Sequence, residues 1–230
     1  MYWSYIMAFG PHPDDADYWC GASLCSSSAD GKHNIVVDLT PSQLSSRWDC
    51  EWRCMEAQES AKVMWLKHRF NLGMEDLKIK DDEFHRMQIA IMIRKYKPEI
   101  IMLPNFVDRH PDHEETAKLI KNSIFVSWLS SVDYQWLQQH RPRLVMEYMI
   151  WDDFEPDLVI WFGEDIYMQK MKAINCFASQ RDTNAWAKNY FASRSMKLWR
   201  KVGRQYWEWF RVISWFIGVD SLYNIYTKPY

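Results

Sequence analysis

Short apolar runs alternate along the whole chain with longer segments of mixed polarity. The apolar runs have the length of buried strands, which we expect at 5–9, 34–38, 69–72, 99–103, 144–151 and 158–162. The segments between them have helical spacing or helix-ending residues, and we expect helices at 16–30, 49–67, 82–97, 115–129, 164–178 and 184–201. This alternation predicts an α/β fold that is Rossmann-like, with a mostly parallel sheet covered by helices on both faces.

Apolar positions also predict which side of two helices faces the core. In the 49–67 segment the expected buried side is Trp52, Met55, Ala57, Ala61, Met64 and Trp65. In the 82–97 segment it is Phe84, Met87, Ile91 and either Ile93 or Met92. No repeat, low-complexity tract or linker interrupts the pattern, so residues 1–230 are interpreted as a single domain.

Charge and hydropathy narrow the class of protein. The formal net charge of -2 gives no electrostatic case for a nucleic-acid or membrane partner. No N-terminal targeting signal is visible, and no apolar run reaches the roughly 18 residues of a membrane span. We therefore expect a cytoplasmic protein with a small-molecule partner.

The cysteine and tryptophan content narrows the class of protein less than charge and hydropathy do. The five cysteines form an odd set without a CxxC pair, which favours reduced thiols over a disulfide framework or a thiolate zinc site. Fourteen tryptophans are a large number for this length. They are consistent with core, a subunit interface or the wall of a site for a ring-shaped ligand, and composition does not choose among these.

The first cluster of reactive side chains follows the first expected strand. After the Gly10-Pro11 break, the sequence places His12, Asp14 and Asp15 just past the strand end, where α/β folds keep their chemistry. His12 and Asp15 can ligate one metal ion from a single turn. Asp14 lies between them and is available for another role.

A second cluster, Asp108 to His113, follows the strand expected at 99–103. Its histidines, His110 and His113, are three residues apart. With His12 and Asp15 of the first cluster they would form one set of metal ligands. Either cluster alone fits a proline-containing turn in which Asp caps a helix equally well. Together they favour a His/Asp/His site with an open position for water, which is the arrangement of catalytic zinc.

Five motifs carry a resemblance to a known family. They are the FGPHPDD loop (9–15), Arg53 with Glu56, the FNLGM stretch (70–74), DRHPDH (108–113) and GRQYWEWF (203–210). Over nearly its whole length the chain resembles the LmbE/PIG-L family of zinc-dependent N-acetylglucosamine deacetylases. The GVDSLY segment (218–223) is similar to the bacterial branch that deacetylates N-acetylglucosaminyl-malate in bacillithiol biosynthesis.

The resemblance implies a role for each matching residue. The implied zinc ligands are His12, Asp15 and His113, with one ion per chain, and other divalent transition metals such as ferrous iron or cobalt would suit them too. The implied catalytic residues are the general base Asp14, the protonated His110, Asp112 that orients it, and Tyr206 at the oxyanion. The implied substrate-binding residues are Arg53 and Arg109. The resemblance also implies a homo-oligomer, with a hexamer suggested.

Three of these assignments have a simpler interpretation. Arg53 could pair with Glu56 or Asp49 on a helix surface, and Arg109 could neutralise Asp108 or Asp112. Tyr206 stands in an aromatic run, which is more often core than catalyst.

The chain departs from the family pattern at four positions. It has Ala22 in place of the second glycine of a Gly-Gly pair, Pro11 in place of a small residue, and Trp199 and Trp209 where the family tends to have glycine. Because the ligands are retained, metal binding is less affected by these changes than turnover.

The sequence therefore predicts a zinc-dependent amidohydrolase that releases acetate and a free amine from an N-acetylglucosaminide, with N-acetylglucosaminyl-malate as the expected substrate. The alternative is a catalytically impaired zinc-binding protein of the same fold, acting in assembly or binding. Retention of Asp14 and His110 favours the enzyme, because binding alone needs no acid-base pair beside the metal. A dinucleotide enzyme is disfavoured, since no GxGxxG follows the first strand.

Overall fold

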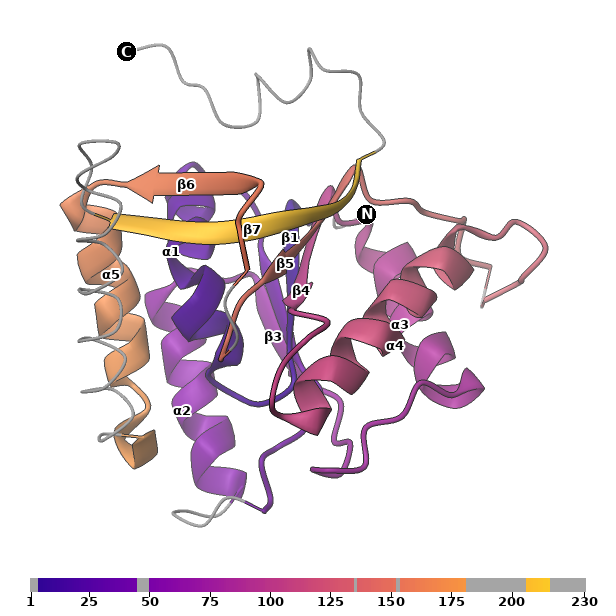
Figure 1. Cartoon of the computed structure of the whole chain (residues 1–230), viewed down its shortest axis with the longest axis horizontal. Helices are drawn as coiled ribbons and strands as arrows, with labels where there is room; N and C mark the ends of the chain where they lie inside the picture. The colour runs from indigo at the N-terminus through magenta and orange to yellow at the C-terminus, as the bar shows by residue number, and fades with distance from the viewer. Residues whose placement is uncertain (1–3, 45–49, 135, 152–153, 181–205, 216–230) are drawn as a thin grey trace.

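One seven-stranded sheet organises the part of the chain that the computed structural model describes, which is residues 4–44, 50–134, 136–151, 154–180 and 206–215. The strand order is β3-β2-β1-β4-β5-β7-β6 (Figure 1). The strands are β1 (Ile6–Gly10), β2 (Ile35–Asp38), β3 (His68–Asn71), β4 (Ile100–Pro104), β5 (Leu144–Tyr148), β6 (Leu158–Phe162) and β7 (Tyr206–Trp215). Strands β1 to β5 pair in parallel, whereas β7 is antiparallel to both of its neighbours, β5 and β6.

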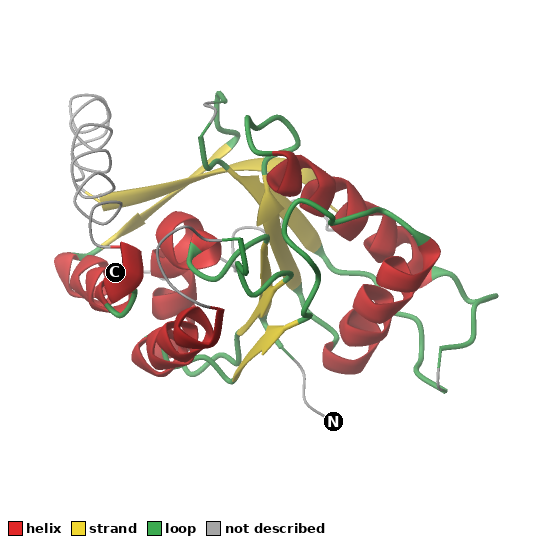
Figure 2. Cartoon of the chain, turned by 90° about the horizontal axis from the view of Figure 1, so that it is seen from below, coloured by secondary structure: helices red, strands yellow, loops and turns green. Residues whose placement is uncertain are grey.

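Helices cover both faces of this sheet. They are α1 (Asp15–Ala29), α2 (Cys50–Val63), α3 (Glu83–Tyr96), α4 (Pro111–Trp128) and α5 (Glu164–Asn175), followed by a short 3-10 helix, η1 (Ala178–Gln180). Helices α1, α2 and α5 pack together on one face, and α3 and α4 pack together on the other (Figure 2). The predicted α/β fold with a mostly parallel, doubly covered sheet is confirmed.

The parallel strands are buried on both sides, and their alternate residues feed two separate cores. In β1, Ile6 and Ala8 face the core under α1 and α5, while Met7 and Phe9 face the core under α3 and α4. Every residue of β1, β2, β4 and β5 is buried. This explains why these strands are apolar without alternation in the sequence.

The chain reverses its direction of winding between β1 and β4. From β1 the sheet grows outward through β2 to β3, and from β4 it grows the other way through β5. The carboxyl ends of β1 and β4 therefore diverge into helices on opposite faces and leave a crevice, which is where open α/β sheets bind ligands.

The sequence did not predict β7. Residues 206–210 were noted only as a family motif, whereas the structure extends them into a ten-residue strand inserted between β5 and β6. The reason is Glu208, whose buried carboxylate interrupts the apolar pattern of the strand. Its charge is balanced by Lys170 of α5 at 2.8 Å, and it accepts hydrogen bonds from the Ala22 and Ser23 amides of α1.

The predicted inward side of α2 is confirmed in part, since Ala57, Ala61 and Met64 are buried as expected. Trp52, Met55 and Trp65 are exposed, and the helix instead buries Arg53 and Glu56. The other residues of α2 that it buries are Ala57, Ser60 and Ala61. A charged inward side is stable here because each buried charge has a partner: Glu56 accepts from the amide and hydroxyl of Ser179, and Arg53 contacts the loop before α1.

Three further expectations concern helices: two differ from the structure, and one cannot be compared with it. On α3, Phe84 is exposed, and the buried residues are Ile89, Ala90, Ile93, Arg94 and Tyr96. Helix α4 begins at Pro111, four residues earlier than expected, because proline is well suited to the first helical position. The helix expected at 184–201 lies outside the described residues.

A buried ion-pair cluster holds α1 against the sheet below the crevice. Arg69 of β3 contacts Asp17 of α1 and Asp38 of β2, each at 2.8 Å, and all three side chains are buried. Removing one member would leave an uncompensated buried charge, which is strongly destabilising. The cluster therefore fixes the start of α1, which carries part of the site described below.

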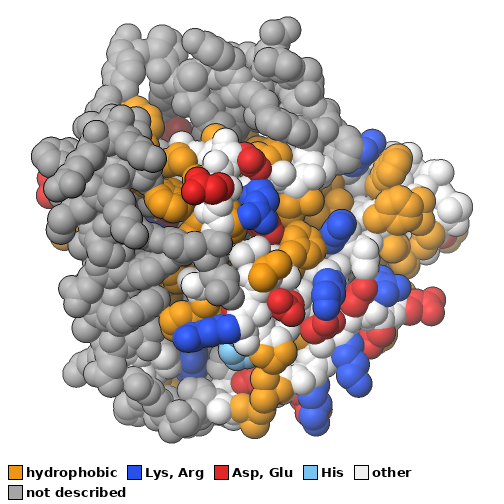
Figure 3. Space-filling model, viewed as in Figure 1, with side chains coloured by type: hydrophobic (Ala, Val, Ile, Leu, Met, Phe, Trp, Pro, Cys, Tyr) orange, Lys and Arg blue, Asp and Glu red, His pale blue; other side chains and the backbone are white. Residues whose placement is uncertain are grey.

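The outer surface carries charges of both signs. On the face formed by α3 and α4, acidic and basic side chains lie interspersed (Figure 3). None of the described helices combines the length and the apolar composition that crossing a bilayer requires.

Candidate metal centre

Two loops meet at the crevice between β1 and β4, and each carries one of the clusters found in the sequence. The first loop leaves β1 and enters α1, and the second leaves β4 and enters α4. Because β1 and β4 are adjacent and parallel, both loops emerge at the same edge of the sheet. The polar residues of the two motifs are thereby brought together.

The first loop is a tight turn held by its own polar groups. The backbone amide of His12 donates to Oδ2 of Asp15 at 3.0 Å, and the imidazole Nδ1 lies 3.3 Å from the same oxygen. Gly10 suits the strand end, since a Cβ there would lie only 3.1 Å from the His12 carbonyl oxygen. The turn therefore directs an imidazole and a carboxylate to one point.

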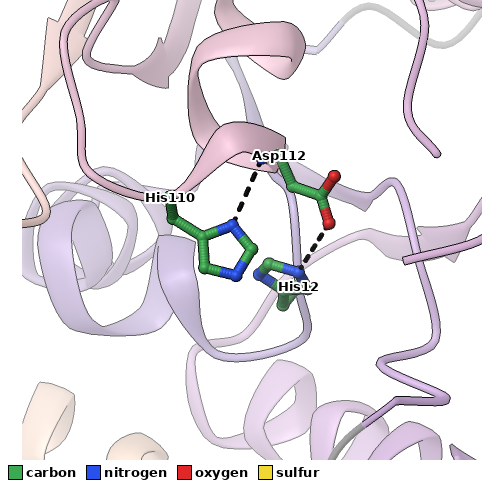
Figure 4. Close-up of side chains that lie close together, drawn as sticks. All are labelled: His12, His110 and Asp112. Atoms are coloured by element: carbon green, nitrogen blue, oxygen red, sulfur yellow. Dashed lines mark hydrogen bonds and ion pairs between the residues drawn. The ribbon is translucent and has the colours of Figure 1, made fainter. Parts of the chain in front are cut away.

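The second loop places its histidines on the first turn of α4. His110 is the N-cap, and its Nδ1 accepts from the Asp112 amide at 3.2 Å (Figure 4). The rings of His110 and His113 are stacked, with centroids 4.7 Å apart and planes 16° apart. The early start of α4 thus sets the positions of both side chains.

The described residues contain two groups of donors that could hold a metal ion. One group is His12, Asp15 and His113, and the other is His12, His110 and Asp112. Within each group the ligand atoms lie within 4.8 Å of one another. Imidazole nitrogens with one carboxylate oxygen suit zinc and similar divalent ions, so the residues fit the metal that the family resemblance implies.

His12 is surrounded by carboxylates. Its Nε2 lies 3.3 Å from Oδ2 of Asp112 and 3.9 Å from Oδ1 of Asp76, a buried oxygen with no hydrogen-bond partner among the described residues. Burial opposes the protonated form, but the hydrogen bonds to Asp112 and Asp15 outweigh it and raise the pKa of His12 to about 10. A cation bound to His12 would replace that proton, so metal binding would release it.

Asp14 has an unusual backbone and a buried carboxylate. It occupies the N-cap position of α1, yet its side chain makes no capping hydrogen bond, and its φ of 125° is one that L-residues rarely adopt. Such strain costs roughly 1–3 kcal/mol and is concentrated at functional sites. Burial raises the pKa of Asp14 to about 7, although the nearby guanidinium of Arg53 acts in the opposite direction. The interpretation of Asp14 as a simple helix cap does not fit this geometry.

His110 is in an environment that disfavours its protonated form. Burial, followed by repulsion from His113 and His12, lowers the pKa of His110 below 6.5. Its Nδ1 accepts the Asp112 amide hydrogen, so the proton of the neutral ring is on Nε2, which can donate a hydrogen bond. The carboxylate of Asp112 contacts His12 and the Leu77 amide, so its role in orienting His110 stays a prediction.

Asp108 is a site residue that the sequence left without a role. Its Oδ1 lies 3.1 Å from Nδ1 of His113 and accepts the His110 amide, while Oδ2 accepts the Trp151 amide. A carboxylate on one ring nitrogen fixes the orientation of a histidine whose other nitrogen faces a metal. The available signal was the position of Asp108 at the start of the DRHPDH motif.

We expect Asp108→Ala to weaken metal binding about 10- to 100-fold, the usual effect of removing such a partner from a ligating histidine. The measurement is competition for zinc against a chelator of known affinity. Asp108→Asn is the matched control, because its amide oxygen still accepts from His113 and should recover part of the affinity. Unchanged affinity in Asp108→Ala would show that His113 needs no orienting group.

Three predicted site residues remain, which are Arg53, Arg109 and Tyr206. Arg53 is buried, and its Nη2 lies 3.1 Å from Oδ2 of Asp14, so its interpretation as a helix-surface residue is wrong; Asp49 lies outside the described residues. Arg109 is exposed, with its guanidinium carbon 3.8 Å from the centre of the Trp151 ring. The ring of Tyr206 stacks on that of Tyr167, with centroids 4.1 Å apart.

Comparison with known proteins adds a family and several relatives. The family model PIG-L, described as GlcNAc-PI de-N-acetylase, matches residues 7–124, slightly more than half of the chain. A diacetylchitobiose deacetylase from Thermococcus kodakarensis is 21% identical over 221 residues, which cover 90% of this chain and 82% of the relative.

Two solved structures share the fold over most of their length. The conserved protein TT1542 from Thermus thermophilus has a TM-score of 0.85 at 24% identity, covering 93% of this chain and 96% of its own. The N,N'-diacetylchitobiose deacetylase from Pyrococcus horikoshii, complexed with its inhibitor MPG, has a TM-score of 0.80 at 22% identity, covering 91% and 84%. The matched family segment contains both loops of the candidate metal centre.

Proposed function

This chain belongs to the PIG-L family of GlcNAc-PI de-N-acetylases, and we propose that it is a zinc-dependent hydrolase that removes the acetyl group from an N-acetylglucosaminide. The observation that carries the proposal is the position of Asp14. Its buried carboxylate stands between the ligand candidates His12 and Asp15 in the sequence, in a strained turn, and does not cap its helix. A binding protein has no use for such a carboxylate, whereas amide hydrolysis needs a base beside the attacking water.

The proposed ligands are His12, Asp15 and His113. A divalent ion held by them would polarise the acetyl carbonyl and make water a stronger nucleophile at neutral pH. Asp15 is well suited to this role, since the pKa of its carboxyl is lowered to about 2 by His113 and His12 against the effect of burial. It is therefore ionised throughout the neutral range.

Asp14 would act on the attacking water. As the water oxygen bonds to the acetyl carbon, its proton passes to the carboxylate of Asp14. A pKa near 7 gives this carboxylate a much higher proton affinity than an exposed aspartate has. It can therefore hold the proton until the leaving nitrogen needs it.

His110 would act on the leaving group. When the C–N bond breaks, the nitrogen takes the electron pair and must receive a proton to leave as an amine. Asp14 can return to this nitrogen the proton that it took from the water. His110 would assist by donating a hydrogen bond from Nε2 to the tetrahedral intermediate, because its Nδ1 is engaged by the Asp112 amide. The products are acetate and the glucosaminide with a free amine, which balances the addition of one water.

We expect His110→Ala to keep its metal and lose on the order of 10²–10⁴ in turnover, the usual contribution of general acid-base catalysis. Zinc content and acetate release measured on the same preparation test this. Loss of the metal would instead indicate that the ion uses the His12, His110 and Asp112 group.

The finer parts of the proposal rest on the family resemblance. N-acetylglucosaminyl-malate is the proposed substrate, with Arg109 as its proposed polar contact and Tyr206 as the proposed oxyanion donor. The resemblance also implies Arg53 as a polar contact, but its burial favours another role. We also propose a cytoplasmic homo-oligomer. The runner-up remains a zinc-binding protein of this fold without turnover, and the activity of the wild-type protein decides between the two.

The decisive experiment is an acetate-release assay of the purified protein loaded with zinc. N-acetylglucosaminyl-malate and diacetylchitobiose are compared, each with and without a chelator. We expect release that the chelator abolishes and zinc restores, with the malate conjugate as the faster substrate. Faster turnover of diacetylchitobiose would overturn the proposed aglycone and keep the reaction, while no release from either would favour the binding protein.

A further inference from the structure

The side chain of Arg53 is too enclosed to serve well as a substrate-binding group. It is on the inward side of α2, and its side chain is only 7% exposed. Its Nε is buried and has no hydrogen-bond partner among the described residues. A side chain so enclosed presents little surface to a ligand in the crevice.

The contacts of Arg53 are instead with the turn that carries Asp14. One nitrogen, Nη2, donates to the carbonyl oxygen of Pro13 and lies 3.1 Å from Oδ2 of Asp14. The first oxygen belongs to the peptide group that precedes Asp14, and the second belongs to the Asp14 side chain. A single donor shared between them restricts both the peptide plane before Asp14 and the direction of its carboxylate.

This restriction opposes an alternative conformation that the sequence otherwise favours. Aspartate is among the preferred N-cap residues, and in a capping conformation φ returns to the extended region while the carboxylate accepts the first free helix amides. In the structure φ is 125°, and no capping bond from the Asp14 side chain is made. Something must hold the carboxylate away from the helix end, and Arg53 is the buried cation in contact with it.

We infer that Arg53 is a positioning residue that keeps the carboxylate of Asp14 at the metal centre and prevents it from capping α1. The inference rests on the proposed function, in which Asp14 is the base, and it gives Arg53 a role different from direct substrate binding. The substrate-binding role predicts an effect on KM, whereas the positioning role predicts an effect on kcat alone.

The test is a double-mutant cycle on Arg53→Gln and Asp14→Asn with zinc-loaded protein. We expect Arg53→Gln to lower kcat about 10²-fold, the cost of a small misplacement of a reacting group. KM and zinc content should stay near wild type. In the Asp14→Asn background the same change should cost no more than about twofold, because residues acting as one unit are not additive.

Two further variants serve as controls. Arg53→Lys keeps the buried positive charge near Asp14 and should recover part of the lost kcat, and it also provides a variant if Arg53→Gln is poorly folded. Lys62→Gln removes an exposed cation from the same helix, where it pairs with Glu59, and should leave kcat and KM unchanged.

The results that would overturn the positioning role differ from those that would overturn the proposed function. A raised KM with unchanged kcat in Arg53→Gln, or full additivity with Asp14→Asn, would overturn the positioning role. If the wild-type protein releases no acetate, the proposed function fails, and a crystal structure of Arg53→Gln then decides the inference. Asp14 at a positive φ in that structure would overturn it, and Asp14 capping α1 would support it.

Discussion

Acetate release should fall by on the order of 10²–10⁴ when Asp14 is replaced by asparagine, while the zinc content stays near that of the wild-type protein. Asparagine has the size of aspartate and can still hydrogen-bond, but it cannot accept a proton from water. It also cannot balance the charge of Arg53, which contacts Asp14 at 3.1 Å. We therefore expect the melting temperature to decrease by several degrees, with the fold retained.

The measurements are acetate release, elemental analysis and thermal unfolding on the same preparation. Asp165→Asn is a matched control, because Asp165 is an exposed residue in the first turn of α5. Asparagine is as good an N-cap as aspartate, so a capping role for Asp14 predicts almost no change in any of the three quantities. Wild-type turnover in Asp14→Asn would remove Asp14 as the base.

The second large effect is expected for His113→Ala, which should lose most of its zinc and with it the activity. The imidazole of His113 is buried, with Nε2 3.8 Å from Oδ2 of Asp15 and Nδ1 3.1 Å from Oδ1 of Asp108. Its removal leaves two protein ligands, His12 and Asp15, where catalytic zinc sites use three. Because the sheet and helices do not depend on this side chain, far-UV circular dichroism should be almost unchanged.

His85→Ala is the control for this variant, since His85 lies on α3 and belongs to neither ligand group. Elemental analysis after dialysis against a weak chelator measures retained zinc in both proteins. Full zinc occupancy in His113→Ala would mean that the ion is held by His12, His110 and Asp112 instead.

Much of the fold could be read from the sequence because the central strands are buried on both faces. Residues 100–103 are continuously apolar, and the structure places them in β4 at the centre of the sheet. The part that could not be read depends on partners distant in sequence. Glu208 is buried in β7 only because Lys170 and the amides of α1 satisfy it, and no local pattern reports such a contact.

The candidate site shows the same division. His12, Asp15 and His113 could be grouped from the sequence because parallel strands bring their loops to one edge, and the structure does bring these side chains together. The burial of Arg53 could not be predicted in this way. It depends on the direction in which α2 faces, and the apolar residues Trp52 and Met55, which are exposed, favoured the opposite side in the sequence.

The position of β7 also has a consequence for the order in which the protein can be made. In the described sheet β6 pairs only with β7, and β7 also covers the outer edge of β5. On the ribosome, residues 144–162 emerge well before 206–215, so the nascent chain presents an apolar strand with an unpaired edge in the meantime. Unpaired apolar edges favour association between chains. Slow translation of this interval should therefore raise the demand for chaperones, and a chain stopped before residue 206 should aggregate rather than accumulate as a folded fragment.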